Sequence, residues 1–456
     1  MVEFPFNSYT ESLWSYRLIF KPQPSPLTPL SSTCDQERSK LSVELLYHFW
    51  TMAVERKVYV LYTGGTFGMK KDDDGKLVPQ SLDDIKDFII RHTILYERKP
   101  GESEEAVRKR IISPDGLITL YHQLADDDPK AEGKQYKVLY EMDGLPTPID
   151  SSNVTPKDWR IMYEKIEEHM EKYDGFVIIH GTDTMAFTSS ALSFILGEIN
   201  KPVIVTGAQM PIFHPRTDGL DNFIGSMLMA GYFCDRPMLH QVMLYDLNKL
   251  YQGNRVVKFD CDSFSVFDSP DVFPLASLET TIKLFEHKMV EPIFHSSLKC
   301  KTFTLERRPE VRILRFFPGI TENYVRGILD GAEGVILETY GCGNVPNFKW
   351  LGDRLIEAYE SGVLMLNCTQ VYRGTVLPIY AASEILTKAH VISGYDITPE
   401  AAMTKMIWVL MSTFDQETRC EIMECSLYGE SCAPPYRPLQ PSVEPGPKGE
   451  REQTRK

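Results

Sequence analysis

Two stretches of this sequence place a hydroxyl group directly after an apolar run and a glycine. Val58–Tyr62 leads into a glycine pair and Thr66, and Gly175–Ile179 leads into a glycine, Thr182 and Asp183. Such runs are typical of strands buried on both faces of a parallel sheet. One Gly-rich turn is equally typical of an ordinary strand-to-loop connection. The repetition of this design, with a carboxylate beside the second hydroxyl, favours a ligand-binding site over two unrelated turns.

The elements after the second turn are expected to bring both turns to one edge of a sheet. Met185–Leu196 is apolar with small residues and predicts a helix, and Pro202–Thr206 predicts a third strand. A strand, a helix and a parallel strand form a right-handed crossover in nearly all sheets. Open α/β sheets bind ligands beyond the carboxyl ends of their strands. The two turns therefore predict one site.

A polar loop is expected just before a helix. Asp150–Asn153 precedes Thr155, a residue type favoured at helix N-caps, and Pro156, which suits the first helical position. Such a loop is most often plain capping. It is also a good place to hold a carboxylate, because backbone N–H groups at a helix start are free to bind anions. This stretch alone leaves both interpretations open.

With 456 residues, the chain exceeds one ordinary core and predicts two domains. The first should be a larger α/β domain with a mostly parallel sheet and flanking helices, and the second a smaller α/β domain. The segment 277–301 is expected to connect them. Proline and charge content predict disorder at both ends. The expected parts are an extension at 1–51, domains at 52–285 and 309–432, a linker at 286–308 and a tail at 433–456.

Composition bounds the partners and the compartment. A net charge of −14 argues against a nucleic-acid backbone or an anionic membrane as partner. No segment has the apolar length of a membrane span, and the N-terminus lacks a secretory pattern. Nine cysteines without paired spacing favour a reducing cytosol. Cys420, Cys425 and Cys432 cluster without a histidine, so neither a metal site nor a cofactor is expected.

Seven short motifs, in this order, resemble the bacterial-type L-asparaginase family, and especially its cytosolic type I branch. The resemblance runs from about Val58 to about Leu410 and implies the two-domain asparaginase fold. Its most specific motifs are TGGT and HGTDT. The motifs are Thr63–Thr66, Asp150–Asn153, His180–Thr184, Thr206–Gln209, Asn254–Lys258, Tyr340–Asn344 and Asn367–Gln370.

The resemblance assigns a role to each motif residue. Thr66 would be the nucleophile, and Thr182, Asp183 and Lys258 would form a hydrogen-bonded set that handles protons. Ser151 would bind the α-carboxylate of the substrate, while Asp183 would also contact its α-amino group. The Gly65 N–H and the backbone around Thr182 would be the oxyanion donors. The remaining substrate-binding candidates are Asp150 and Ser152.

The sequence departs from the family pattern in the loop after Thr66. That loop is expected to act as a lid, and many family members carry in it a tyrosine that helps to activate the nucleophile. Here the aligned residue is Lys76. Tyr380 is the candidate replacement and Asn344 a second candidate, both supplied by a neighbouring subunit. The activating group stays open.

These assignments predict an L-asparaginase that releases L-aspartate and ammonia, works in the cytosol without a cofactor, and assembles as a homodimer or homotetramer. Asparagine against glutamine preference stays open. Alternatives are a broader amidase or glutaminase, a transamidation subunit, a lysophospholipase and a catalytically silent binding protein. The sequence has no Gly-x-Ser-x-Gly motif of a serine esterase. A silent protein would be expected to have lost part of the threonine, aspartate and lysine set, which is intact.

Overall fold

The computed structural model describes residues 54–92, 101–112, 117–120, 136–286, 308–377, 384–412 and 414–434. The extension expected at 1–51 lies outside these residues. So do nearly all of the linker expected at 286–308 and of the tail expected at 433–456.

A nine-stranded sheet forms the centre of the first domain, in the order β13-β12-β9-β8-β7-β6-β1-β5-β4. The inner strands from β8 to β5 are parallel, and antiparallel strands flank them on both sides. This arrangement confirms the mostly parallel sheet. The inner strands are β1 (Val54–Gly64), β5 (Tyr136–Ile149), β6 (Gly175–Ile179), β7 (Val203–Thr206) and β8 (Val242–Asp246). The flanking strands are β4 (Ile118–Leu120), β9 (Lys249–Gln252), β12 (Ala276–Leu278) and β13 (Ile282–Leu284).

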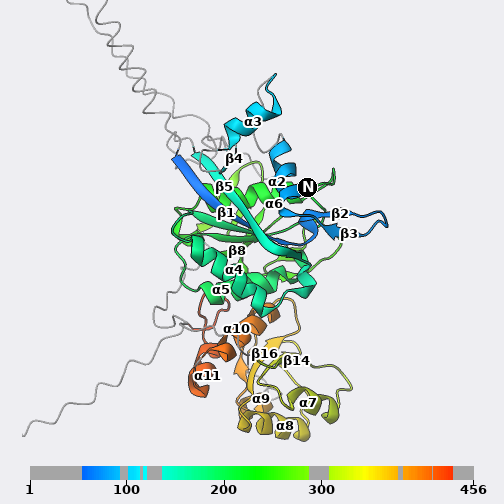
Figure 1. Cartoon of the computed structure of the whole chain (residues 1–456). Helices are drawn as coiled ribbons and strands as arrows, with labels where there is room; N and C mark the ends of the chain where they lie inside the picture. Colours follow the sequence, from blue (N-terminus) through cyan, green and yellow to red (C-terminus); the bar gives the residue numbers. More distant parts are fainter. Residues whose placement is uncertain are drawn as a thin grey trace, which may run out of the picture. The chain divides into compact units, whose positions relative to one another are not determined.

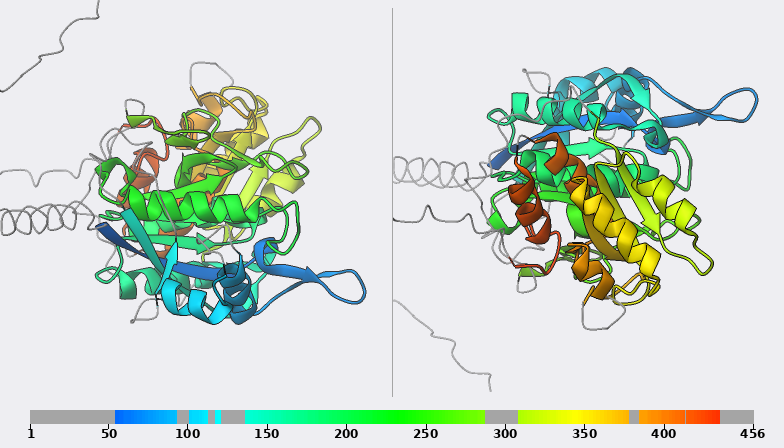
Figure 2. Two further views of the ribbon diagram at one scale, coloured as in Figure 1. Left: turned by 90° about the horizontal axis from the view of Figure 1, so that it is seen from above. Right: turned by 90° about the horizontal axis from the view of Figure 1, so that it is seen from below.

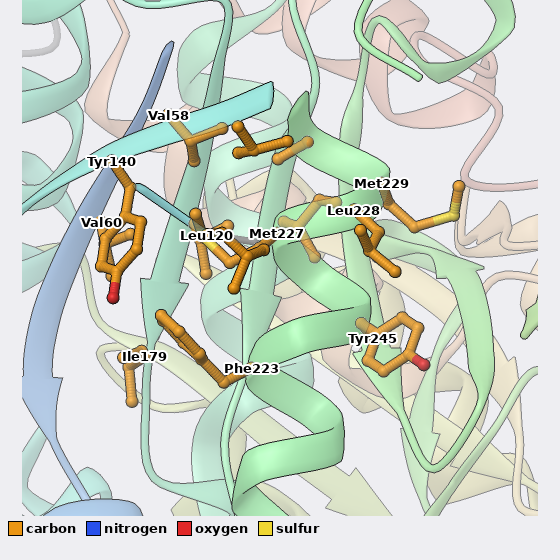
Figure 3. Packing of buried hydrophobic residues seen from close by; sticks show 14 of the residues in the cluster. Val58, Val60, Leu120, Tyr140, Ile179, Phe223, Met227, Leu228, Met229 and Tyr245 are labelled. Atoms are coloured by element: carbon orange, nitrogen blue, oxygen red, sulfur yellow. The ribbon is translucent and has the colours of Figure 1, made fainter. Parts of the chain in front are cut away.

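Helices cover both faces of this sheet (Figure 1). On one face lie α4 (Pro156–His169) and α5 (Met185–Leu196), which pack on the alternate side chains Tyr59 and Leu61 of β1. Among the described residues, the other face carries α2 (Leu82–Arg91), α3 (Glu104–Ile111), α6 (Gly219–Met227) and the π-helical segment η5 (Leu228–Tyr232). Figure 3 shows the core on this face, where Phe223 and Met227 of α6 project toward the sheet strands that carry Val60, Tyr140 and Ile179. Residues on both faces of β1 are fully buried, as its apolar run predicts.

The register of the central strands sets the level of the turns that follow them. Val58 pairs with Gly175 and Tyr62 with Ile179, so β1 and β6 end side by side. Helix α4 begins as predicted: Thr155 donates from its N–H and hydroxyl to Asp158, and Pro156 is the first helical residue. The loop before α4 is thereby held next to the ends of these strands.

A four-stranded parallel sheet with helices forms the second domain, which confirms the smaller α/β unit (Figure 2). Its core lies between the sheet and helices on both of its faces. The strands are β14 (Val311–Arg315), β15 (Gly334–Thr339), β16 (Leu364–Thr369) and β17 (Ile392–Ser393). The helices are α7 (Glu322–Leu329), α8 (Lys349–Glu360), α9 (Glu384–Lys388), α10 (Pro399–Met411) and α11 (Gln416–Glu424).

The expectation of a plain connection over 277–301 is wrong at its beginning. Strands β12 and β13 lie in that segment and extend the large sheet, with Ala276 pairing to both Leu250 and Leu284. Short edge strands of two or three residues bury few side chains, so they leave little periodicity in the sequence. The rest of the expected connection lies outside the described residues.

The turn that precedes Lys258 is anchored on the second domain. The side-chain amides of Gln252 and Asn254 donate to the backbone carbonyl of Tyr428 at 2.9 and 3.0 Å. Arg255 forms an ion pair with Asp396, with 3.1 Å between Nη1 and Oδ1, and both side chains are largely buried. The segment 426–434 therefore connects the two domains at this turn.

A buried ion pair holds that segment in place. Lys405 of α10 and Glu430 approach to 2.7 Å with 1% and 0% of their side chains exposed. Burial opposes the charged form of Glu430, but Lys405 and the N–H groups of Leu427 and Tyr428 outweigh it, so the pKa of this carboxyl lies below its ordinary value.

Glu430→Gln is expected to lower the free energy of unfolding by about 3–5 kcal/mol, because it leaves the buried Lys405 ammonium without its counter-charge. Urea unfolding followed by circular dichroism measures this. Asp353→Asn is the control, since it breaks the exposed pair of Lys349 and Asp353 and should leave the midpoint unchanged. Equal midpoints for the two variants would contradict the assigned role of the buried pair.

Candidate active site

The turns after β1 and β6 touch through two glycines. A Cβ added to Gly65 would lie 2.3 Å from the Cα of Gly181, and the φ of Gly65 is +77°. A Cβ on Gly181 would lie 2.6 Å from Ser151 Oγ. Both positions therefore require glycine. This contact brings the turns that carry Thr66 and Thr182 together with the loop that carries Ser151.

Thr182 is the hub of the side-chain network at this edge. Its Oγ1 accepts hydrogen bonds from Lys258 Nζ and from Gln209 Nε2, each at 3.0 Å. Lys258 also forms an ion pair with Asp183 at 2.7 Å. Thr182 is buried, Lys258 is largely buried, and Asp183 is exposed. The structure thus brings together three of the predicted residues: a threonine, an aspartate and a lysine.

The buried carboxylate of Asp246 holds the strand that pairs with Lys258. Lys258 lies in the short strand β10 (Val257–Lys258), where it pairs with Phe267 of β11 (Phe267–Asp268). The N–H groups of Val266 and Phe267 donate to Asp246 at the end of β8. Burial raises the pKa of Asp246 to about 7, although these two donors oppose the rise. The end of β8 thereby fixes the register of the lysine strand.

Gln209 is a site residue to which the sequence assigns no role. It follows β7, the strand beside β6, and the N–H groups of Gln209 and Met210 donate to the two oxygens of Asp218 at 2.8 and 2.9 Å. Burial raises the pKa of Asp218 above its ordinary value. A motif residue at the carboxyl end of a strand next to Thr182 was the available signal.

His180 orients the peptide that precedes Thr182. Its Nε2 contacts the Thr188 hydroxyl, which accepts from Trp159 Nε1, and its Nδ1 lies 2.7 Å from Gly181 O. Burial lowers the pKa of His180 from 6.5 to about 4, so the ring is neutral at pH 7. Because a carbonyl oxygen can only accept, the Nδ1–H of His180 donates to Gly181 O and holds this carbonyl against the buried ring. The Thr182 N–H lies on the opposite side of this trans peptide from the Gly181 carbonyl.

The loop before α4 supplies Ser151 to the shared edge. Ser151 is buried, and its carbonyl accepts a hydrogen bond from the Thr184 hydroxyl at 2.7 Å. Asp150 accepts from the N–H and the hydroxyl of Ser152, at 3.0 and 2.9 Å. Asp150 and Ser152 are therefore bonded to each other, while Ser151 lies against the two glycine turns.

One expected role meets a structural objection. The Gly65 N–H donates to Ile149 O at 3.1 Å, so it is not free to act as the oxyanion donor assigned to it above. This bond is part of the irregular pairing by which Gly64 of β1 meets Ile149 of β5. The next N–H along this turn is that of Thr66 itself.

No contact with Thr66 is described for Lys76, the residue aligned with the lid tyrosine, or for the candidate Asn344. Lys76 lies in the exposed turn between β2 (Met69–Lys71) and β3 (Leu77–Pro79), a hairpin that projects from the first domain (Figure 2). Asn344 lies in a turn of the second domain, where its Nδ2 contacts Cys342 Sγ at 3.9 Å and its Oδ1 is buried without a described partner. Tyr380 lies outside the described residues.

Two kinds of feature are absent from the part of the chain that the structure describes. No group of three or more His, Cys, Asp or Glu side chains there is arranged to hold a metal ion. None of the helices in this part of the chain combines the length and apolar character needed to cross a membrane.

Comparison with known proteins places this geometry in a family. Residues 57–290 match the family model described as "Asparaginase, N-terminal", and residues 310–423 match "Glutaminase/Asparaginase C-terminal domain". The chain belongs to the asparaginase family. The expected family and fold are thereby confirmed.

Several members of the asparaginase family match most of the chain. L-asparaginase 1 of Escherichia coli is 34% identical over 378 residues, which cover 82% of this chain and 98% of that protein. The human protein called 60 kDa lysophospholipase is 36% identical over 392 residues, covering 86% of this chain. The chain spans 64% of that human relative's length. The crystal structure of L-asparaginase I from Vibrio cholerae is 31% identical with a TM-score of 0.66, covering 83% of this chain and 99% of that one.

His180→Gln is expected to flatten the dependence of stability on pH. A folded-state pKa of about 4, below the unfolded value, means that stability is full above about pH 6.5 and is lost as pH falls toward 4. Between pH 7 and 4 the unchanged protein should lose about 3 kcal/mol more than the variant.

Urea unfolding at a series of pH values measures this difference. His214→Gln is the control, because His214 is exposed, and it should follow the unchanged protein. If the free energy of unfolding depends on pH in the same way for the unchanged protein and for His180→Gln, the pKa of His180 does not differ between the folded and unfolded states. The prediction would then be wrong.

Proposed function

We propose that this asparaginase-family member hydrolyses the side-chain amide of L-asparagine to L-aspartate and ammonia. The observation that carries the proposal is the contact of Lys258 with both Thr182 and Asp183, next to the glycine contact that places Thr66. This set offers a proton acceptor beside a hydroxyl, which is the arrangement that an activated nucleophile requires. The L-asparaginases of E. coli and Vibrio cholerae add support as relatives.

In the proposed reaction the Thr66 oxygen attacks the amide carbonyl carbon. The Thr66 proton passes to the set of Thr182 and Lys258, and the carbonyl oxygen takes up negative charge. When the carbonyl re-forms, the C–N bond breaks and the nitrogen leaves as ammonia with that proton. Water then cleaves the resulting ester: its proton returns to Thr66 and its hydroxyl becomes part of the aspartate carboxylate.

Substrate binding is assigned to groups that line the same edge. The exposed carboxylate of Asp183 is suited to an α-ammonium group, since opposite charges attract at hydrogen-bond distance. Ser151 lies against the two glycine turns and offers a hydroxyl to the α-carboxylate. The Thr182 N–H, which lies opposite the Gly181 carbonyl, is proposed as the donor for the oxyanion, because the Gly65 N–H bonds to Ile149 O.

The relative called 60 kDa lysophospholipase defines the main competing activity. No Gly-x-Ser-x-Gly motif is present in this chain, and the described edge of the sheet offers threonine hydroxyls. The chain covers 64% of that relative, so its printed activity is a candidate to test and not the one proposed. We also propose a cytosolic location, which the free state of all the described cysteines supports.

Thr66→Ala is expected to abolish ammonia release from L-asparagine, with a loss of kcat on the order of 10⁴-fold, because the acyl acceptor is removed. Ammonia release from asparagine and from glutamine, and fatty-acid release from a lysophospholipid, are measured side by side. Thr281→Ala, at an exposed threonine in the loop between β12 and β13, is the control. Activity on neither amide by the unchanged chain would refute the proposal.

We further propose that a second copy of the chain completes the site with its Asn344. Its Tyr380 is the candidate for the group that activates Thr66 in place of the lid-loop tyrosine. The resemblance to a family whose site is closed by a residue of a neighbouring subunit supports this. In a 1:1 mixture of Thr66→Ala and Asn344→Ala chains, dissociated and reassembled, mixed dimers would hold one intact site. About a quarter of full activity should return, because random exchange makes half of the dimers mixed. No recovery, with exchange verified by mass, would contradict shared sites.

A further inference from the structure

The Thr182 hydroxyl has both of its acceptor positions filled. An aliphatic hydroxyl carries one hydrogen and two lone pairs. Lys258 Nζ and Gln209 Nε2 each lie 3.0 Å from this oxygen, and both are donors. The hydroxyl hydrogen therefore points toward neither of them. The hydrogen is therefore free to bond to a third group.

The two donors to Thr182 differ in one chemical respect. The ammonium of Lys258 can lose a proton and become an acceptor, whereas the amide nitrogen of Gln209 stays a donor at all relevant pH values. Gln209 is also fixed in place, since its own N–H and that of Met210 are bound by the two oxygens of the buried Asp218.

We propose that Gln209 is a positioning residue that makes Thr182 a directed proton carrier between Thr66 and Lys258. This inference rests on the proposed function and names a device within the same site. With Lys258 as an amine, Thr182 donates to Lys258, Gln209 fills one lone pair of Thr182, and the other lone pair faces Thr66. With Lys258 as an ammonium, Gln209 is unchanged and the Thr182 hydrogen faces the substrate.

The proton count closes over one half-reaction. When Thr66 attacks, its proton moves to the free lone pair of Thr182 while the former Thr182 proton moves to Lys258. When the C–N bond breaks, Lys258 returns a proton to Thr182 and Thr182 gives one to the leaving nitrogen. Without Gln209 the hydroxyl can rotate, and its free lone pair no longer has a single direction.

Other charged groups face Lys258 and bear on a pH experiment. Asp183 contacts it directly at 2.7 Å. A cavity of about 220 Å³ borders Lys258 on the side of the second domain. The other titratable and charged residues that line this cavity are Asp271, Arg315, Glu338, Tyr372, Asp396 and Glu400. All of them are unchanged in the variants below, so a difference between variants reports on position 209.

Gln209→Met and Gln209→Glu separate positioning from packing. The methionine keeps the side-chain length but removes the donor, so kcat should fall about 10- to 100-fold with KM changed by less than about 3-fold. The glutamate accepts the Thr182 hydrogen and places a negative charge within about 6 Å of Lys258, which favours the ammonium. Its kcat should also fall, and the rising limb of the pH–rate profile should move up by about one unit.

Two further variants complete the experiment. Asp218→Asn keeps the Gln209 side chain but weakens the hydrogen bonds that hold the backbone of Gln209 and Met210. It should lower kcat less than Gln209→Met does and should not move the pH profile. Gln241→Met is the matched control, because the amide of Gln241 bonds to Met238 O away from the site. It should leave both kcat and the pH profile unchanged.

The outcomes distinguish the inference from the function beneath it. The role assigned to Gln209 is overturned if kcat is unchanged in both Gln209 variants. It is also overturned if Gln209→Glu lowers kcat without moving the pH profile. In both cases the proposed asparaginase activity stands. An unchanged chain without ammonia release overturns the proposed function and this inference with it. Thermal unfolding of each variant verifies folding, and if Gln209→Glu does not fold, the kcat-against-KM comparison of Gln209→Met and Asp218→Asn decides.

Discussion

The absence of side chains at Gly65 and Gly181 is the constraint on which the site depends. Any Cβ at Gly65 would overlap the backbone of the neighbouring turn, so a residue larger than glycine would drive the ends of β1 and β6 apart. Thr66 and Thr182 follow these glycines by one residue each. Their proximity is therefore a backbone property, set by strand register and two missing methyl groups, and the side-chain network is built on top of it.

Two buried carboxylates hold the segments around the glycine contact in place. Asp218 binds the backbone that carries Gln209, and Asp246 binds the strand that pairs with Lys258. Each is buried, each binds two N–H groups, and each has a raised pKa. The two side chains that bond to the Thr182 oxygen thus come from segments with the same kind of support: a loop for Gln209 and a short strand for Lys258.

The sequence predicts the central strands and the grouping of Thr182, Asp183 and Lys258, because long buried runs and specific motifs are strong signals. It does not predict β12 and β13, whose few residues carry little periodicity. Nor does it predict the bond of the Gly65 N–H to Ile149, which depends on an irregular strand pairing. Gln209 was visible as a motif residue, but its direction depends on Asp218, nine residues away. The roles of Thr66, Ser151 and Tyr380 stay predictions.

The anchoring of the turn at 252–255 on the carbonyl of Tyr428 bears on which changes this family member tolerates during evolution. A main-chain carbonyl is present whatever the residue, so this clamp places no demand on the side chain at position 428. It does demand a backbone path of fixed length between α11 and the end of the described segment. Insertions and deletions there should consequently be rarer than substitutions, and a gene in which one domain is exchanged for a distant relative's should lose the fit between them.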